Sequence, residues 1–166
     1  MRLIITAVLA AGTLAAQSGL IVGSSKGLFD SVRDNVLKAA DKVPDDLWSY
    51  QPTPQVRTFA QLFAHEADGQ YEFCSIATGK PVRKNIESSV KGKGAIIAAL
   101  KDAFAYCDDA FAKMSEADAV SPVNMFGQKM TKIAIMDFNT AHTNEHYGNL
   151  VTYMRLKGIV PPSSPQ

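Results

Sequence analysis

The chain has 166 residues, of which 46% are hydrophobic and 20% charged, and its formal net charge is +1. This length and composition fit one globular domain with a sizeable core, and they exclude collagen-like and intrinsically disordered proteins. The near-zero net charge gives no electrostatic case for a nucleic-acid partner, and two cysteines are too few for a disulfide-rich scaffold or a thiolate zinc site.

The first sixteen residues have the pattern of a secretory signal peptide. Met1 and Arg2 precede an uncharged apolar stretch from Leu3 to Ala16 that ends in small residues. This stretch is shorter than the ~20 residues that a membrane-spanning helix needs, although an uncleaved N-terminal anchor is the alternative. We therefore expect residues 1–16 to be a signal peptide, residues 17–166 to form a single domain, and the protein to be periplasmic or secreted.

The rest of the chain predicts four long helices, because apolar residues recur at steps of three and four, as on one face of an α-helix. The four stretches run from Leu28 to Val43, from Val56 to about Thr78, from about Gly94 to Ala117 and from about Met130 to Lys157. Leu28 belongs to the apolar face of the first helix, and Pro44 should end that helix near Lys42.

The connections between these helices contain little predicted strand. The segment 121–130 has Gly127 between two short apolar runs, which predicts a small hairpin. The basic segment from Lys80 to Lys93 reads as a solvated loop that is long enough to cross the bundle. An all-α four-helix bundle is therefore the expected fold, and this linker permits a topology in which sequential helices are not all antiparallel.

The chain has only three histidines, His65, His142 and His146. His142 and His146 are four residues apart, so both side chains leave the same face of the fourth helix about one turn apart. Two imidazoles at this spacing can share a metal ion, and His65 in the second helix would complete a set of three. Three protein ligands with an open fourth position are typical of a catalytic zinc site, although imidazole also suits nickel and iron. Histidine pairs also occur on helix surfaces by chance, so the spacing alone leaves both interpretations open.

Two segments resemble the DinB superfamily of four-helix-bundle proteins, namely LFAHEADGQYEF at 62–73 and AHTNEHYGNLVTYMRLKGIVPP at 141–162. Members have one histidine in the second helix and an H-x-x-x-H pair late in the last helix, followed by glycine and a C-terminal proline. The tract PDDLWSYQPTPQVRTFAQL at 44–62 also resembles the family's segment before the second helix.

This resemblance implies an up-down-down-up bundle in which His65, His142 and His146 hold a divalent metal ion, with zinc, nickel or iron as candidates. The chain departs from many relatives at one place, because Glu145 stands where they have a further histidine before the last ligand.

A metal-bound water would need a general base, and carboxylates near the histidines are the natural candidates. Glu72 lies two turns after His65 on the same line of the helix, so we expect it to be the catalytic carboxylate. Glu66 and Glu145 are expected at the surface, pointing away from the ion.

Cys74 and Cys107 lie on the apolar faces of the second and third predicted helices. Small buried cysteines are common at such positions, so we expect two buried thiols. A disulfide is the alternative in an exported protein.

The sequence thus favours an exported, metal-dependent hydrolase or transferase that acts on a small-molecule substrate. A thiol transferase would need a low-molecular-weight thiol, which is scarcer outside the cytoplasm, so hydrolysis is preferred. A non-catalytic bundle that binds a metal or a small ligand, and a structural protein, are the alternatives. We expect no nucleic-acid partner and no stable membrane insertion after signal cleavage, and the sequence leaves open whether the chain forms a homodimer.

Overall fold

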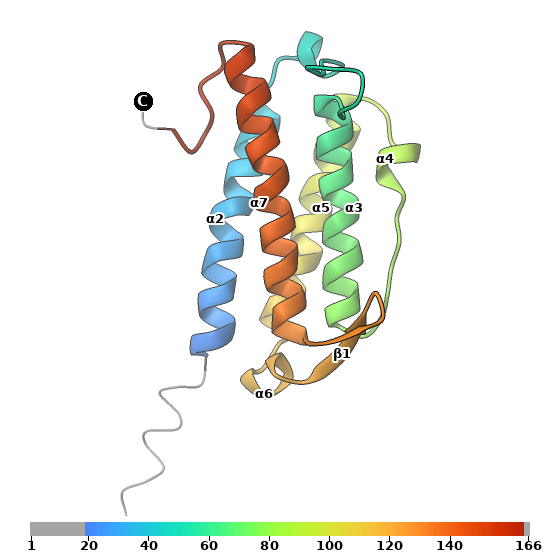
Figure 1. The fold of residues 1–166 in the computed structure, drawn as a ribbon, viewed down its shortest axis with the longest axis vertical. Helices are drawn as coiled ribbons and strands as arrows, with labels where there is room; N and C mark the ends of the chain where they lie inside the picture. The colour runs from blue at the N-terminus through green and yellow to red at the C-terminus, as the bar shows by residue number, and fades with distance from the viewer. Residues whose placement is uncertain (1–18, 165–166) are drawn as a thin grey trace, which may run out of the picture.

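Four long helices lie side by side in the computed structural model, which describes residues 19–164 (Figure 1). They are α2 (Leu20–Lys42), α3 (Phe59–Ala77), α5 (Lys93–Ala112) and α7 (Lys132–Leu156). In chain order they run up, down, down and up in the view of Figure 1. The mostly helical fold that the sequence predicts is confirmed. The predicted signal peptide lies outside the described residues, and no helix within 19–164 is long and apolar enough to cross a membrane.

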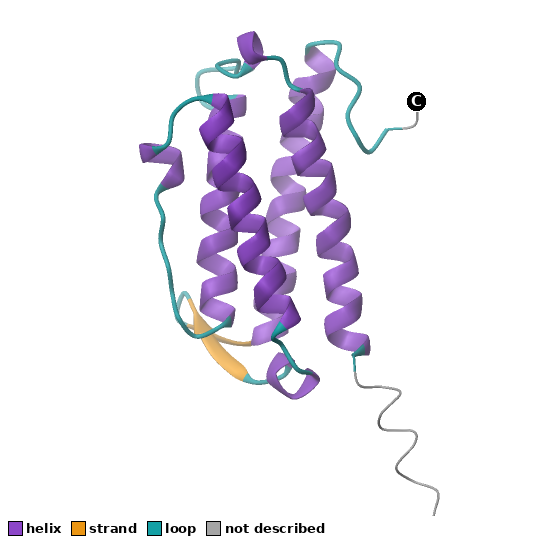
Figure 2. Cartoon of the chain, turned by 180° about the vertical axis from the view of Figure 1, so that it is seen from behind, coloured by secondary structure: helices purple, strands orange, loops and turns teal. Residues whose placement is uncertain are grey.

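The remaining elements are short and lie at the ends or on the outside of the bundle (Figure 2). They are the 3-10 helix η1 (Asp45–Leu47), α4 (Ile86–Ser89), α6 (Glu116–Ala119), β1 (Pro122–Met125) and β2 (Gln128–Thr131). The long connection that carries α4 runs along the outside of the bundle from the end of α3 to the start of α5. As a result α3 and α5 run in the same direction.

The predicted hairpin is confirmed as the antiparallel pair β1 and β2, in which Met125 pairs with Gln128. Phe126 and Gly127 form the two-residue turn, with φ of 50° and 82°. Positive φ at both central residues is what a tight hairpin turn requires, and glycine adopts it without strain.

Local sequence signals explain where the helices begin and end. Thr58 and Gln61 form a capping box at the start of α3, and α2 ends at Lys42 before Pro44, as predicted. However, α2 begins at Leu20, eight residues earlier than predicted, and Leu28 is 66% exposed instead of lying in the core. The neighbouring Phe29 is buried, because successive residues of an α-helix point about 100° apart.

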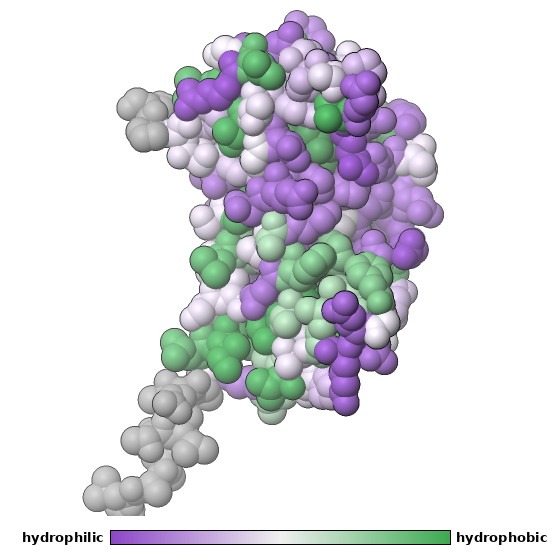
Figure 3. All heavy atoms as spheres, viewed as in Figure 1, coloured by the Kyte–Doolittle hydropathy of each residue, from purple (hydrophilic) through white to green (hydrophobic). Residues whose placement is uncertain are grey.

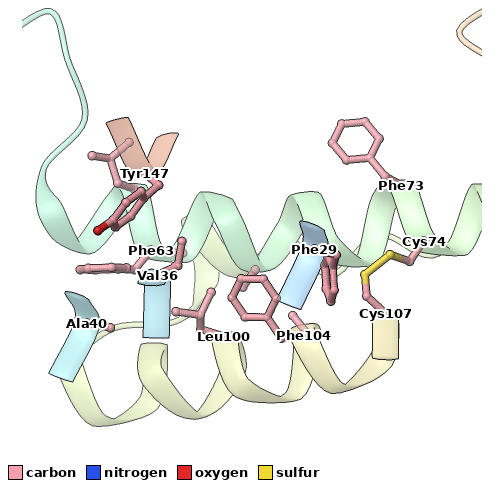
Figure 4. Close-up of a cluster of buried hydrophobic side chains, with 14 of the residues drawn as sticks. Phe29, Val36, Ala40, Phe63, Phe73, Cys74, Leu100, Phe104, Cys107 and Tyr147 are labelled. Atoms are coloured by element: carbon pink, nitrogen blue, oxygen red, sulfur yellow. A yellow bond between two sulfur atoms is a disulfide. The ribbon is translucent and has the colours of Figure 1, made fainter. Parts of the chain in front are cut away.

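The core lies between the four long helices. The ring of Phe29 on α2 is 5.9 Å from that of Phe104 on α5, and Val36 and Leu100 are buried in the same cluster (Figure 4). At one end of the bundle, Trp48 stacks on Phe63 with ring centroids 5.2 Å apart. The segment between α2 and α3 thus closes this end of the core.

The prediction of two buried thiols is wrong, because Cys74 of α3 and Cys107 of α5 form a disulfide (Figure 4). Their Cα atoms are 5.4 Å apart, within the range of a disulfide. Both cysteines lie on apolar helix faces, as expected, but α3 and α5 turn these faces toward each other and place the two residues at the same level. No pattern within either helix shows that the two cysteines lie at the same height along the bundle.

Candidate metal centre

The three histidines come together between α3 and α7. His65 projects from α3, His142 and His146 project from α7, and one ring nitrogen of each lies within 4.8 Å of the others. The Nε2 atoms of His142 and His146 are 3.2 Å apart, and the ring of His65 lies 5.2 and 4.8 Å from these two rings. This is the convergence that three ligands of one ion need.

A glycine in α3 makes room for one of these rings. A Cβ atom at Gly69 would lie 3.0 Å from Cε1 of His142, closer than side chains normally approach. The absence of a side chain at this position therefore lets His142 lie against α3, near His65.

Each ring turns its Nδ1 atom toward a polar side chain outside the cluster. The pairs are His65 with Glu87 Oε2 at 3.2 Å, His142 with Glu66 Oε1 at 3.7 Å, and His146 with Asn149 Nδ2 at 3.4 Å. Metal-binding histidines usually donate one ring N–H to an acceptor such as a carboxylate, which fixes the ring and leaves the other nitrogen for the ion. Glu87 and Glu66 present such oxygens to His65 and His142, whereas Asn149 turns its Nδ2 donor toward His146.

The partner of His65 comes from the linker between α3 and α5. The carboxylate of Asp68 accepts hydrogen bonds from the backbone N–H groups of Ile86 (2.7 Å) and Glu87 (2.9 Å), and the buried Ile86 side chain anchors α4. Glu87 then accepts from Arg57 Nε at 2.9 Å through its other oxygen. The interpretation of this linker as a solvated loop is therefore wrong at Glu87. No motif or spacing in the sequence indicates that Glu87 lies beside His65.

Glu66, which we expected at the surface, is completely buried. The error could have been avoided, because Glu66 falls on the same helical face as the buried Phe59, Phe63, Gln70 and Phe73. Burial raises the pKa of Glu66 to about 8. The Thr143 and Gln70 side chains have the opposite, smaller effect on this pKa.

The buried carboxyl of Glu66 also supports a metal at this place. Neither of its oxygens nor Nδ1 of His142 makes a hydrogen bond within the described chain, and buried polar atoms without a partner are rare. A cation at Nε2 of His142 favours a proton on Nδ1, which a carboxylate at Glu66 can accept. The residues therefore fit a metal ion.

The environment of the three histidines favours their neutral, ligating forms. Burial, with help from the neighbouring His146 and His65, lowers the pKa of His142 to about 4. Burial and the charge of Arg57 lower the pKa of His65, against the opposing effect of Glu87. Burial and the neighbouring His65 lower the pKa of His146. A neutral imidazole is the form that binds a metal ion.

Two hollows flank the histidines. One, of about 200 Å³, is lined by His65, Asp68, Gly69, Glu72, Phe73, Arg83, Lys84, Asn85 and His142. The other, of about 590 Å³, is lined by Gln51, Pro54, Gln55, Val56, Arg57, Gln61, Leu62, Glu87, Glu145, His146, Asn149 and Tyr153. Hydrophilic side chains gather across the middle of the face formed by α3 and α7 (Figure 3).

The predicted catalytic carboxylate shares the smaller hollow with two of the histidines. Oε1 of Glu72 accepts a hydrogen bond of 2.9 Å from Nη2 of Arg83, a residue of the linker. Glu145 is exposed, as expected, and lines the larger hollow beside His146.

A family model for the DinB superfamily matches residues 28–150. The chain belongs to the DinB superfamily. Its fold is similar to that of a DinB-like protein from Bacillus cereus, with a TM-score of 0.73, 18% identity, and coverage of 84% of this chain and 97% of the other. A DinB-like protein from Bacillus subtilis gives a TM-score of 0.68 at 22% identity, with coverage of 88% and 95%. No curated protein matches this DinB chain significantly.

Proposed function

We propose that this DinB protein binds a divalent transition metal ion through the Nε2 atoms of His65, His142 and His146. The observation that carries the proposal is the convergence of the three rings, each with its Nδ1 atom against a polar neighbour. Three imidazoles leave a coordination position open for a substrate, and they suit zinc, nickel or iron.

We further propose that the protein is a metal-dependent hydrolase or transferase for a small substrate. An ion in this position would supply Lewis acidity that polarises a bound substrate or a water molecule. The chain contributes the three imidazoles, the carboxyl groups of Glu66 and Glu87 that orient them, and hollows on both sides that admit a small molecule. Glu72 is the proposed general base, because its carboxylate lies at the hollow that His65 and His142 line.

Export is part of the proposal, and the disulfide between Cys74 and Cys107 supports it. Disulfides persist in oxidising compartments and are rare in the cytosol of most organisms. The predicted cleavage after Ala16 would leave α2, which begins at Leu20, intact. Because low-molecular-weight thiols are scarcer outside the cytoplasm, we favour hydrolysis over thiol transfer.

A non-catalytic metal- or ligand-binding bundle is the second candidate function. The observation that favours it is the use of the nearby carboxylates: Glu66 and Glu87 face outer ring nitrogens, and Glu72 is paired with Arg83. A hydrolase requires Glu72 to accept a proton from a water molecule while Arg83 holds its Oε1, whereas a binding protein requires no such step.

Metal analysis and one variant test the proposal. Purified protein is expected to contain one equivalent of a transition metal, and His142→Ala should lose more zinc affinity than the roughly 10–100-fold that loss of a ligand-orienting partner costs. Asn144→Ala, on the exposed side of the same helical turn, is the control and should bind zinc like the parent. Circular dichroism should show a folded bundle in both variants. Unchanged zinc affinity in His142→Ala would contradict the metal site, and hydrolase and transferase assays with the metal found then separate enzyme from binding protein.

A further inference from the structure

We propose that Arg57 binds a carboxylate group of the substrate, in the larger hollow beside His146. This inference rests on the proposed metal site, because it assigns a second anchor to the molecule that the site would act on. It names the chemical class of that molecule as a small, polar carboxylic acid.

The hydrogen bonds of Arg57 leave one edge of its guanidinium group for a ligand. Nε donates to Oε1 of Glu87 at 2.9 Å, whereas Nη1 and Nη2 make no hydrogen bond or ion pair with residues 19–164. The side chain is 40% exposed and lines the larger hollow. Two parallel N–H groups on a planar guanidinium match the two oxygens of a carboxylate, so the open edge has the geometry of a carboxylate receptor.

Arg57 is also fixed close to the histidines. The carboxylate of Glu87 contacts Arg57 with one oxygen and Nδ1 of His65, 3.2 Å away, with the other, so both groups are held by one side chain. Arg57 and His146 line the same hollow. A molecule anchored on Arg57 in this hollow therefore has its remaining atoms beside a proposed metal ligand.

With a divalent ion at the histidines, the charges around the larger hollow would favour an anion. Its lining has one positive side chain, Arg57, and two negative ones, Glu87 and Glu145. A divalent ion at the histidines would give this region one net positive charge, and the Arg57 guanidinium would repel that ion. A bound anion with one negative charge, lying between Arg57 and the ion, would neutralise the net charge and reduce this repulsion.

The rest of the lining selects a polar molecule with a single negative charge. The same hollow is lined by the amide side chains of Gln51, Gln55, Gln61 and Asn149, which can hydrogen-bond to hydroxyl or amide groups. A phosphate dianion would exceed the single net positive charge of the metal-loaded region, and the carboxylates of Glu87 and Glu145 would repel it more strongly than a monoanion. The geometry therefore points to a carboxylate.

Calorimetric titration of the zinc-loaded protein tests this assignment. The probes are acetate, succinate and glutarate, with uncharged succinamide and inorganic phosphate as comparisons. We expect at least one carboxylate to bind, succinamide not to bind, and phosphate to bind more weakly. Arg57→Gln should raise the Kd for carboxylates by roughly tenfold or more. Arg57→Lys keeps the positive charge but lacks the two parallel N–H groups, so its Kd should lie between those of the parent and Arg57→Gln.

Arg155→Gln is the matched control, because it removes an exposed arginine that lines neither hollow and should leave carboxylate binding unchanged. Zinc affinity should be as high in Arg57→Gln as in the parent, or higher, because a positive charge near the ion is lost. The proposal is overturned if no carboxylate binds, if Arg57→Gln binds carboxylates like the parent, or if phosphate or succinamide binds more tightly than every carboxylate. Failure of the parent protein to take up zinc would instead contradict the proposed metal site.

Discussion

The neighbours of each imidazole determine how well it can bind a metal ion. Glu87 at the Nδ1 atom of His65 favours a proton on that nitrogen, which leaves Nε2 with its lone pair toward the other two rings. An oxygen of Glu66 faces Nδ1 of His142 from 3.7 Å, without a hydrogen bond. At the scale of single residues, the affinity of the site therefore depends on the groups that face the rings as well as on the rings themselves.

Glu87→Gln should weaken zinc binding by roughly tenfold or more, because a neutral amide holds the His65 ring less firmly and adds less to its basicity. Glu145→Gln is the matched control. It also removes a carboxylate from the larger hollow, but Glu145 makes no hydrogen bond to an imidazole ring within residues 19–164. Competition titration with a zinc chelator measures both affinities. Equal losses in the two variants would mean that only net charge matters and that Glu87 has no orienting role.

Zinc binding should persist to lower pH than an exposed histidine site allows. The pKa of His142 is lowered to about 4, mainly by burial, and the pKa values of His65 and His146 are lowered too. A base with a lowered pKa stays neutral until the pH falls below that value, so protons should compete weakly with zinc at pH 6.5, where ordinary histidines are half protonated. Zinc titrations between pH 4 and pH 8 would show this, and a steep loss of affinity already between pH 7 and pH 6 would refute it.

Three helices meet at the site, and α7 is far from the other two in the sequence. The helices α3 and α7 supply the imidazoles, and α4, held by Asp68, brings Glu87 to the edge of His65. The close approach of α3 and α7 at Gly69 decides how near His142 lies to His65. At this scale the spacing between helices controls the geometry of the ligands.

Gly69→Ala should therefore weaken zinc binding by about tenfold or more, because the new methyl group pushes the His142 ring away from its position. Gly148→Ala, in α7 with no atoms within 4 Å of the added Cβ, provides the comparison. That variant should keep its zinc affinity and gain roughly 0.5–1 kcal/mol of stability from the higher helix propensity of alanine. Zinc titration and urea unfolding of both variants test this, and an unchanged affinity in Gly69→Ala would show that the ring tolerates the contact.

At the scale of the whole molecule, the disulfide joins the two helices that the long linker separates in the sequence. Cys74 and Cys107 are 33 residues apart, and the segment between them contains α4 and most of α5. The bond therefore restricts the unfolded chain.

Reduction of the disulfide should lower the free energy of unfolding by about 4 kcal/mol, the amount expected for a closed loop of this length. Urea unfolding with and without a phosphine reductant measures the difference. A Cys74→Ala/Cys107→Ala variant should show no effect of the reductant. The native mass should also be two hydrogens below that of the reduced chain, and alkylation of both cysteines without reduction would contradict the bond.

Periodicity and local signals in the sequence determined the helices, the hairpin and the residue types of the site. The apolar repeat, Pro44 and Gly127 each act on residues close to them in the sequence, so their effects can be predicted without knowing the fold. The spacing of His142 and His146 is also local, and His65, the only other histidine, completes the set that the family resemblance implies. These are the parts of the structure that short-range geometry dictates.

Contacts between distant segments were decided only by the tertiary structure. The Cys74–Cys107 bond depends on the relative level of α3 and α5, and Glu87 reaches His65 only because Asp68 fixes α4 beside α3. Leu28 is exposed because the packing of α2 turned a different face inward. Such features depend on how packed helices shift and rotate against one another. The packing energy depends on both helix surfaces together, so the sequence of one helix alone does not determine it.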